Sequence, residues 1–390
     1  MTKTELLKTT TDKFNSFFGT AHTHAAYAPG RVEVLGNHTD YNEGYVLSAA
    51  INMGICFLIA PSTDRTCRLV AGDLMQEVSF DMDAVVRDPQ TMWGNYVKGV
   101  FAKLRPHIAS DKGWNGLFFS TIPMGAGLSS SAALEISAAL AICGVYGMTR
   151  PPMELALIGQ AAEHEYVGTK CGVMDQISSL FGKAGHLVRS DFRTLTVSTS
   201  PMGSDFCFLV VGTNAKHALV DGAYNERRQS CERAAAYFAA VLDHPVKALR
   251  DVSMDEWLQH KDRMPTLEAK RSAHVIGENE RVLAGAEALQ QGDISHFGFL
   301  MFESHHSSIV NFENSCPELD FIVDQARRIP GILGARLSGG GFGGSAVLLV
   351  HPRDVEVVAH ALSGPYRKQF GHACTVHTII PSDGAHLMTE

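Results

Sequence analysis

The sequence predicts an α+β protein of two domains, because its length and the order of its predicted elements both favour that class. The chain has 390 residues, enough for two domains with sizeable cores. Strands and helices are both predicted, but they do not alternate regularly as they would in a doubly wound sheet. A Ser, Gly and Pro cluster at residues 198–204 interrupts the predicted strands. We therefore expect one domain at residues 1–198 and a second at residues 199–390.

The predicted elements follow from apolar patterning and turn signals. Strands are expected at residues 31–35, 45–60, 114–122, 187–189, 206–211, 336–338 and 345–351. Helices are expected at residues 129–146, 151–167, 225–243 and 268–291. The first helix follows three Ser and ends at a Gly, and the second has two Pro in its first turn.

Composition excludes several classes of function. The formal net charge of -8 disfavours a nucleic-acid partner, because a polyanion would be repelled. The eight Cys are scattered without a Cys-x-x-Cys pair, which is typical of reduced thiols in a cytosolic protein. Residues 1–8 are polar and no apolar run is long enough to span a bilayer, so we expect a cytoplasmic protein without membrane contact.

A Gly-rich turn before the helix at residues 129–146 has the features of a phosphate-binding loop. Gly125 and Gly127 would let the backbone approach an anion closely, and the free N–H groups of the first helical turn would point at it. Hydroxyl groups of Ser129, Ser130 and Ser131 would add donors and a Mg²⁺ ligand. An ordinary Ser-capped helix after a Gly turn explains this segment equally well.

Two better-known nucleotide loops do not fit. A Walker loop needs a Lys, and residues 123–131 contain none. Gly339, Gly341 and Gly344 match the spacing of a dinucleotide-binding fingerprint, but a strand rather than a helix is predicted to follow them. A dinucleotide-dependent oxidoreductase is therefore disfavoured.

Two further segments carry side chains suited to phosphorylating a small polyol. Residues 37–42 form a dense polar loop after a strand, with the amide, imidazole and carboxylate groups that sugar hydroxyls require. Transfer of a phosphoryl group also needs a metal, a residue facing the acceptor hydroxyl and a positive charge. Glu163 with Ser131 could hold the metal, Asp175 could face the hydroxyl, and Arg31 could supply the charge. Each also has a simpler interpretation: a polar turn for the loop, a helix cap for Asp175 and a solvated helix residue for Glu163.

Over nearly its whole length the chain resembles the galactokinases, a family of the GHMP small-molecule kinases. The segments that carry the resemblance are residues 30–47, 123–133, 171–176, 224–231, 303–307, 315–320 and 334–344. It implies a two-domain α+β fold with the active site in the cleft between the domains. It also implies ATP-dependent phosphorylation of α-D-galactose at the C1 hydroxyl, giving galactose 1-phosphate and ADP in the Leloir pathway of galactose metabolism. The partners would be the sugar and ATP, and we expect a monomer.

The resemblance also assigns roles to individual residues. Asp175 would deprotonate or orient the C1 hydroxyl, with Arg31 as its electrostatic partner. The sugar would be bound by Asn37, His38, Asp40, Gly172 and Tyr224. The ATP phosphates would lie on Gly125, Ala126, Gly127, Leu128, Ser129 and Ser130, with Trp93 near the adenine. Mg²⁺ would be held by Ser131 and Glu163.

The first of these segments departs from the family pattern. The family usually has Glu where Asn37 stands, Asn where Glu33 stands, and Pro where Ser48 stands. The usual Glu accepts a hydrogen bond from the C6 hydroxyl, whereas the neutral Asn37 can both donate and accept. We therefore expect galactose to be held less discriminately at C6, and a sharper hypothesis is that galacturonate is accepted.

Two alternatives within the superfamily stay open at this point. A galactose sensor without turnover is disfavoured, because the Ser-Ser-Ser-Ala-Ala run at residues 129–133 is complete and Asp175 is present. A kinase for mevalonate or homoserine is disfavoured by the His-Thr-Asp-Tyr loop at residues 38–41.

Overall fold

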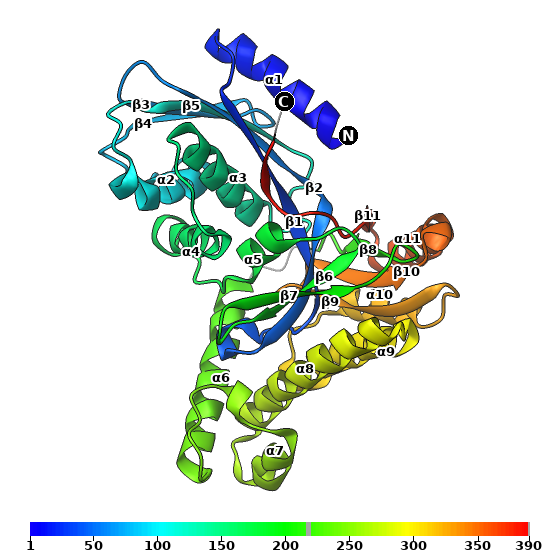
Figure 1. Ribbon diagram of the computed structural model, residues 1–390. Helices are drawn as coiled ribbons and strands as arrows, with labels where there is room; N and C mark the ends of the chain where they lie inside the picture. The colour runs from blue at the N-terminus through cyan, green and yellow to red at the C-terminus, as the bar shows by residue number, and fades with distance from the viewer. Residues whose placement is uncertain (216–219, 389–390) are drawn as a thin grey trace.

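The computed structural model describes residues 1–215 and 220–388, and contains two β-sheets with helices packed against them (Figure 1). The larger sheet has eight strands. They are β1 (His24–Leu35), β2 (Tyr45–Pro61), β3 (Thr66–Ala71), β4 (Gln76–Asp81), β5 (Trp114–Ser120), β6 (His186–Asp191), β7 (Thr196–Pro201) and β12 (His386–Met388). The smaller sheet has four strands in the order β11-β8-β10-β9. They are β8 (Cys207–Gly212), β9 (Ile332–Ser338), β10 (Ser345–Val350) and β11 (Thr375–Ile379).

Two long strands organise the larger sheet. β1 and β2 pair antiparallel along most of their length, so the strand expected at residues 31–35 begins seven residues earlier, at His24. The apolar stretch expected at residues 45–60 is the single strand β2. Its first part pairs with β6 and its last part with β5, so β2 connects the two ends of the sheet. The polar loop after β1 is thereby held on a rigid support.

Alternate side chains of β1 pack on opposite faces of the larger sheet, as the period of a strand requires. Ala25 and Tyr27 pack beneath helix α1 (Lys3–Phe18), whereas Ala26 and Ala28 face the core on the other side. That second face is covered by α2 (Met92–Leu104), α3 (Ser130–Val145), α4 (Pro152–Ala162) and α5 (Met174–Phe181).

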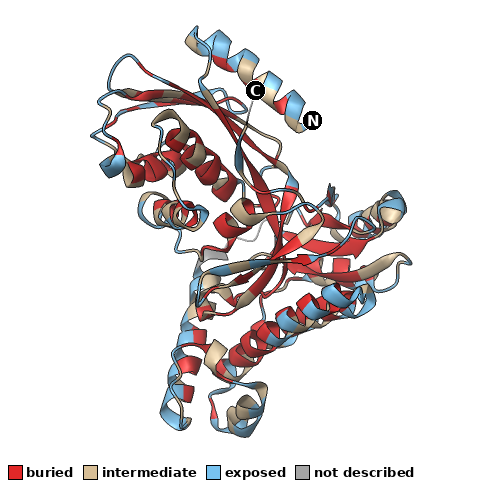
Figure 2. Cartoon of the chain, viewed as in Figure 1, coloured by how far each residue is buried: buried red, intermediate tan, exposed pale blue. Residues whose placement is uncertain are grey.

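The smaller sheet is also covered on both faces. Helix α9 (Ile294–Ser307) packs against β9 on one side and connects to α8 (Thr266–Gln291), while α10 (Pro317–Ala326) and α11 (Val355–Phe370) cover the other side. Helices α6 (Val220–Val241) and α7 (Met254–His260) pack beside α8. Buried residues run continuously from the larger sheet into β8, β10, α8 and α9, so the two sheets share one apolar core (Figure 2).

Two expectations differ in detail from the structure. The expected helix at residues 151–167 is confirmed as a helical segment that ends at Gly168, which has a φ of 97°, but its last turn (Glu163–Val167) is π-helical and not part of α4. The expected domain boundary at residue 198 falls inside β7, and β12 near the C-terminus pairs with β1. The division into residues 1–198 and 199–390 stays a prediction.

Neither a disulfide nor a membrane span is found in the described part of the chain. All eight cysteines are free thiols, and seven of them are buried. Among residues 1–215 and 220–388, no helix combines the length and the apolar character that crossing a bilayer requires.

The packing of α9 on β9 depends on a close backbone approach. A Cβ at Gly298 would lie 2.1 Å from the carbonyl oxygen of Leu333, a distance that no side chain can tolerate. Gly298→Ala should therefore lower the free energy of unfolding by about 1–3 kcal/mol through overpacking. Gly222→Ala on α6 is the control, because nothing lies within 4 Å of its Cβ. Chemical denaturation measures both, and equal stability of the two variants would contradict this packing.

Candidate functional site

A pocket opens where segments from distant parts of the sequence meet. It is lined by the end of β1 and the loop after it, by residues 168–175, by the start of α6 and by the turn between β9 and β10. Seven of the predicted residues line it: Arg31, Asn37, His38, Asp40, Gly172, Asp175 and Tyr224. The fold therefore places the predicted sugar and catalytic residues around one cavity.

Arg31 and Asp175 form the closest charged contact in this pocket. Arg31 donates from Nε to Oδ1 of Asp175 at 2.6 Å and from Nη2 to Oδ2 at 2.7 Å, a bidentate pair. Its third nitrogen, Nη1, donates to the carbonyl of Gly127 at 2.7 Å. Burial is the largest single influence and opposes the charge of Arg31, but Asp175, together with Glu33 and Glu163, outweighs it and raises the pKa of the guanidinium. One side chain thus ties the start of α5 to the Gly-rich turn.

The Gly-rich turn before α3 does not contain an ordinary Ser cap. Ser129 stands at the N-cap position with a φ of 54°, yet it makes no side-chain cap hydrogen bond. Its hydroxyl donates to Oδ2 of Asp175 instead. The N–H groups of the first helical turn are therefore not satisfied by Ser129 and can bind an anion. This excludes the simpler interpretation of the segment.

The rest of this turn is shaped for close approach. Gly125 and Gly127 both have positive φ, 72° and 69°, and both are exposed. Ala126 and Leu128 are buried and anchor the turn, since their carbonyls accept from the Ser345 hydroxyl at 2.8 Å and the Arg31 backbone N–H at 3.0 Å. The exposed glycines and Ser130 form the outer surface of the turn.

Glu163 and Ser131 lie together, as the metal-site prediction requires. Glu163 is the first residue of the π-helical turn and is only 7% exposed, so it is not a solvated helix residue. Burial raises its pKa, while hydrogen bonds from the Cys171 thiol and the Ser131 hydroxyl oppose the rise. A carboxylate beside a hydroxyl is an oxygen donor set that suits Mg²⁺.

His38 is held as a neutral ring with a defined tautomer. Its Nε2 faces the carbonyl of Gly340 at 3.0 Å and must carry the proton, so Nδ1 accepts from the Tyr41 hydroxyl at 2.8 Å. Burial lowers the pKa of His38 to about 4. The ring lies 5.1 Å from that of Tyr224, which completes this wall of the pocket. Both ring nitrogens of His38 are thus occupied within the protein.

Asp40 and Gly172 approach each other closely across the pocket. Burial raises the pKa of Asp40 to about 7, and the Glu33 carboxylate adds to the rise. A Cβ at Gly172 would lie 1.8 Å from Oδ2 of Asp40. Position 172 therefore requires glycine for the Asp40 carboxylate to keep its place.

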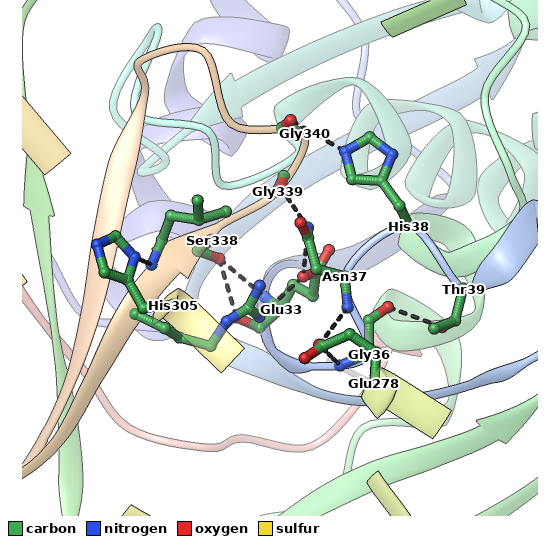
Figure 3. Close-up of polar contacts among 12 residues, drawn as sticks. Glu33, Gly36, Asn37, His38, Thr39, Glu278, His305, Ser338, Gly339 and Gly340 are labelled. Atoms are coloured by element: carbon green, nitrogen blue, oxygen red, sulfur yellow. Dashed lines mark hydrogen bonds and ion pairs between the residues drawn. The ribbon is translucent and has the colours of Figure 1, made fainter. Parts of the chain in front are cut away.

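The sequence did not single out a buried polar network under the loop (Figure 3). Glu33, placed only by its departure from the family pattern, accepts from Nδ2 of Asn37 at 3.0 Å and from Nη1 of Arg336 at 2.9 Å. Burial raises the pKa of Glu33, and Arg336 opposes the rise. Glu278 accepts from the backbone N–H groups of residues 36 and 37 at 2.9 and 2.8 Å. Glu278 comes from α8, far along the chain, so no local signal could have found it.

The structure also shows the hydrogen-bond partners of Ser48 and Trp93. Ser48, where the family has Pro, forms a buried hydrogen bond of 2.6 Å with Ser178 and so links β2 to α5. Trp93 on α2 donates to Gln76 at 2.8 Å and packs against Phe118, and it does not line the pocket. Its position near adenine stays a prediction.

Comparison with known proteins identifies the family. The chain matches "Galactokinase galactose-binding signature" at residues 12–61, "GHMP kinases N terminal domain" at residues 95–183 and "GHMP kinases C terminal" at residues 286–368. It is 40% identical to a galactokinase of Roseiflexus sp. (strain RS-1) over 96% of this chain and 95% of that one. It is also 40% identical to a galactokinase of Glaesserella parasuis serovar 5 (strain SH0165), over 96% of this chain and 98% of that one. The chain belongs to the galactokinase family.

Solved structures agree with this assignment. The structure of Lactococcus lactis galactokinase complexed with galactose has a TM-score of 0.92 at 31% identity, and the match covers 97% of this chain and 99% of that one. A mevalonate kinase has a TM-score of 0.61 at 18% identity, covering 94% and 100%, which shows a shared fold alone. The predicted α+β fold of the GHMP kinases is thus confirmed.

Asp40 should make stability depend on pH. Its raised pKa means that the folded protein keeps a proton that the unfolded chain releases between about pH 4 and 7. The stabilisation is complete below pH 4 and is lost as pH rises through 7. Asp40→Asn should therefore stabilise the protein relative to wild type more at pH 8 than at pH 5, by on the order of 1–4 kcal/mol. Denaturant unfolding at both pH values measures the difference in stability between Asp40→Asn and wild type, and the exposed Asp12→Asn on α1 is the control. A difference that is equal at pH 5 and pH 8 would contradict the raised pKa of Asp40.

Proposed function

We propose that the protein transfers the γ-phosphoryl group of ATP to the C1 hydroxyl of α-D-galactose, giving galactose 1-phosphate and ADP. The observation that carries the proposal is the position of Asp175, which lines the pocket and contacts both Arg31 of β1 and Ser129 of the Gly-rich turn before α3. A hydroxyl group beside Asp175 and a phosphate on the turn would be neighbours. The galactokinase relatives support the same reaction.

The sugar would be held mainly by carboxylates and backbone groups of the pocket. Asp40 offers a carboxylate to accept hydrogen bonds from sugar hydroxyls, and Tyr224 packs beside it with His38. Asp175, kept in position by the bidentate contact with Arg31, would orient the C1 hydroxyl and accept its proton. Arg31 would also balance negative charge that gathers where the phosphoryl group moves.

The phosphates of ATP would bind at the free N–H groups that begin α3, and the positive end of the helix would favour their charge. The Ser131 hydroxyl and the Glu163 carboxylate would hold Mg²⁺ beside them. When bound, that ion would neutralise phosphate charge and align the oxygens. No cluster of three His, Cys, Asp or Glu side chains that could hold a metal occurs in the described ranges, so phosphate oxygens and water would complete the coordination. A cytoplasmic, monomeric enzyme stays our expectation.

A coupled assay for ADP formation tests the reaction directly. Purified protein with ATP and Mg²⁺ would be given galactose, glucose, N-acetylgalactosamine or galacturonate. Turnover of galactose well above the other sugars would support the proposal. Galactose binding without any turnover would favour a sensor, and preference for another sugar would change the substrate.

Asp175→Asn should separate chemistry from binding. The amide keeps the shape of the side chain but cannot accept the proton, so kcat should fall by about 10²–10⁴. The galactose Kd, measured by calorimetry, should change by less than about threefold. The exposed Asp12→Asn on α1 is the control and should keep the wild-type kcat. A normal kcat in Asp175→Asn would remove this residue from the proposed role.

Gly172→Ala should weaken sugar binding through Asp40. Because the new Cβ would lie 1.8 Å from Oδ2, the carboxylate must move away from its position in the pocket. We expect the galactose Kd to rise by about tenfold or more, as for the loss of a hydrogen bond to a charged group. The control is Gly222→Ala, which adds a Cβ to open space. An unchanged Kd in Gly172→Ala would show that Asp40 does not bind the sugar from this position.

A further inference from the structure

Glu33 and Asn37 form a pair whose hydrogen bonds define what one end of the pocket can recognise. Both line the pocket near Gly339 and Gly340, and their side chains are joined by the 3.0 Å bond from Nδ2 of Asn37 to Oε1 of Glu33 (Figure 3). The sequence suggested that Asn37 meets the sugar directly. The hydrogen-bond donors and acceptors of the two side chains indicate different roles for Asn37 and Glu33.

The hydrogen-bonding groups of Asn37 are already occupied. Its two Nδ2 hydrogens are donated to Oε1 of Glu33 and, at 2.7 Å, to the carbonyl of Gly339. Its Oδ1 accepts from Nδ2 of Asn314 at 2.8 Å. Turning the amide over would place its oxygen against a carboxylate and a carbonyl, so the orientation is determined. The residue is also 0% exposed.

Glu33, in contrast, keeps one free acceptor. Oε1 receives both Asn37 and Arg336, whereas Oε2 has no hydrogen-bond partner among the described residues. Glu33 is 3% exposed, and Arg336 is 0% exposed. Burial raises the pKa of Glu33, and the charged Arg336 guanidinium beside it opposes that rise by favouring the carboxylate. Its unused oxygen needs a hydrogen bond that only a ligand or water can supply.

Two other charged pairs lie near this end of the pocket. Arg31 is paired with Asp175, and Glu278 is paired with Arg281 at 2.6 Å. Asp40 adds a second carboxylate on the pocket wall. A ligand hydroxyl can donate to such a surface, whereas a ligand carboxylate only accepts and would lie against Glu33 without a donor.

We propose that Glu33, rather than Asn37, binds a sugar hydroxyl through Oε2, and that the pair excludes sugars bearing a carboxylate at this position. Asn37 is then a positioning residue that holds Glu33 and the Gly339 carbonyl. The inference rests on the proposed function and specifies its substrate class as a neutral hexose, not a uronic acid. It reverses the hypothesis that Asn37 opens the pocket to galacturonate, because the carboxylate is retained four residues earlier in the chain.

Calorimetry with galactose and galacturonate tests the inference without relying on turnover. Wild type should bind galactose at least 100-fold more tightly than galacturonate. Glu33→Gln keeps the size of the side chain but replaces the free acceptor oxygen with an amide group. Galactose affinity should therefore fall at least tenfold, and the ratio of galactose affinity to galacturonate affinity should decrease. A folded Glu33→Gln variant with wild-type affinity and selectivity would overturn the proposal.

A reciprocal exchange guards against a variant that fails to fold. Glu33→Asn removes the carboxylate beside Arg336, and Asn37→Glu places two carboxylates together, so each should lose galactose binding. The double variant again has one carboxylate and one amide at these two positions. It should bind galactose at least tenfold more tightly than expected from adding the losses in binding free energy of the two single variants. Additive losses would overturn the inference. If the wild-type protein phosphorylates galactose but binds galacturonate with equal affinity, only this inference is overturned. If the wild-type protein does not phosphorylate galactose, the proposed function is overturned.

Discussion

The site depends above all on the buried charge of Arg31. Arg31 is 7% exposed, and its guanidinium reaches the Asp175 carboxylate and the Gly127 carbonyl together. A charge removed from water must be paired, so the position of Asp175 is set by the same contact that stabilises the fold. Because Arg31 lies on the long strand β1, its contacts fix the Gly-rich turn and the start of α5 to the larger sheet. Positioning of this kind is what a phosphoryl transfer chiefly requires of a protein.

A second buried ion pair joins the two sheets. Arg336 on β9 of the smaller sheet contacts Glu33 on β1 of the larger one, and the neighbouring Ser338 exchanges hydrogen bonds with the Glu33 backbone. The pocket therefore lies at a junction that is bonded on both sides and lined from both sheets. Its shape is a property of the whole chain, since breaking either pair would leave an isolated charge in the core.

Low solvent access also determines how the ionisable groups behave. Burial lowers the pKa of His38 and raises the pKa of Asp40 and Glu163, in each case favouring the neutral form. His38 can therefore act as a fixed hydrogen-bonding link near neutral pH. The two carboxyl groups are held at an energetic cost, which in the proposed function sugar hydroxyls would offset at Asp40 and a cation at Glu163. Such costs are typical of binding sites, where the empty protein is poised for its ligands.

The sequence by itself determined the fold class, the main strands and helices, and most residues around the pocket, because these follow from local apolar periods and from contiguous motifs. Asp175 and Asp40 were found in this way, and Gly172 was found through the resemblance to the galactokinases. Tertiary structure alone decided that Ser129 bonds to Asp175 instead of capping its helix, and that Glu33 is buried against Arg336. Partners separated by some 300 residues leave no local pattern, and whether a polar side chain faces water, a ligand or a buried charge depends on elements that only folding brings together.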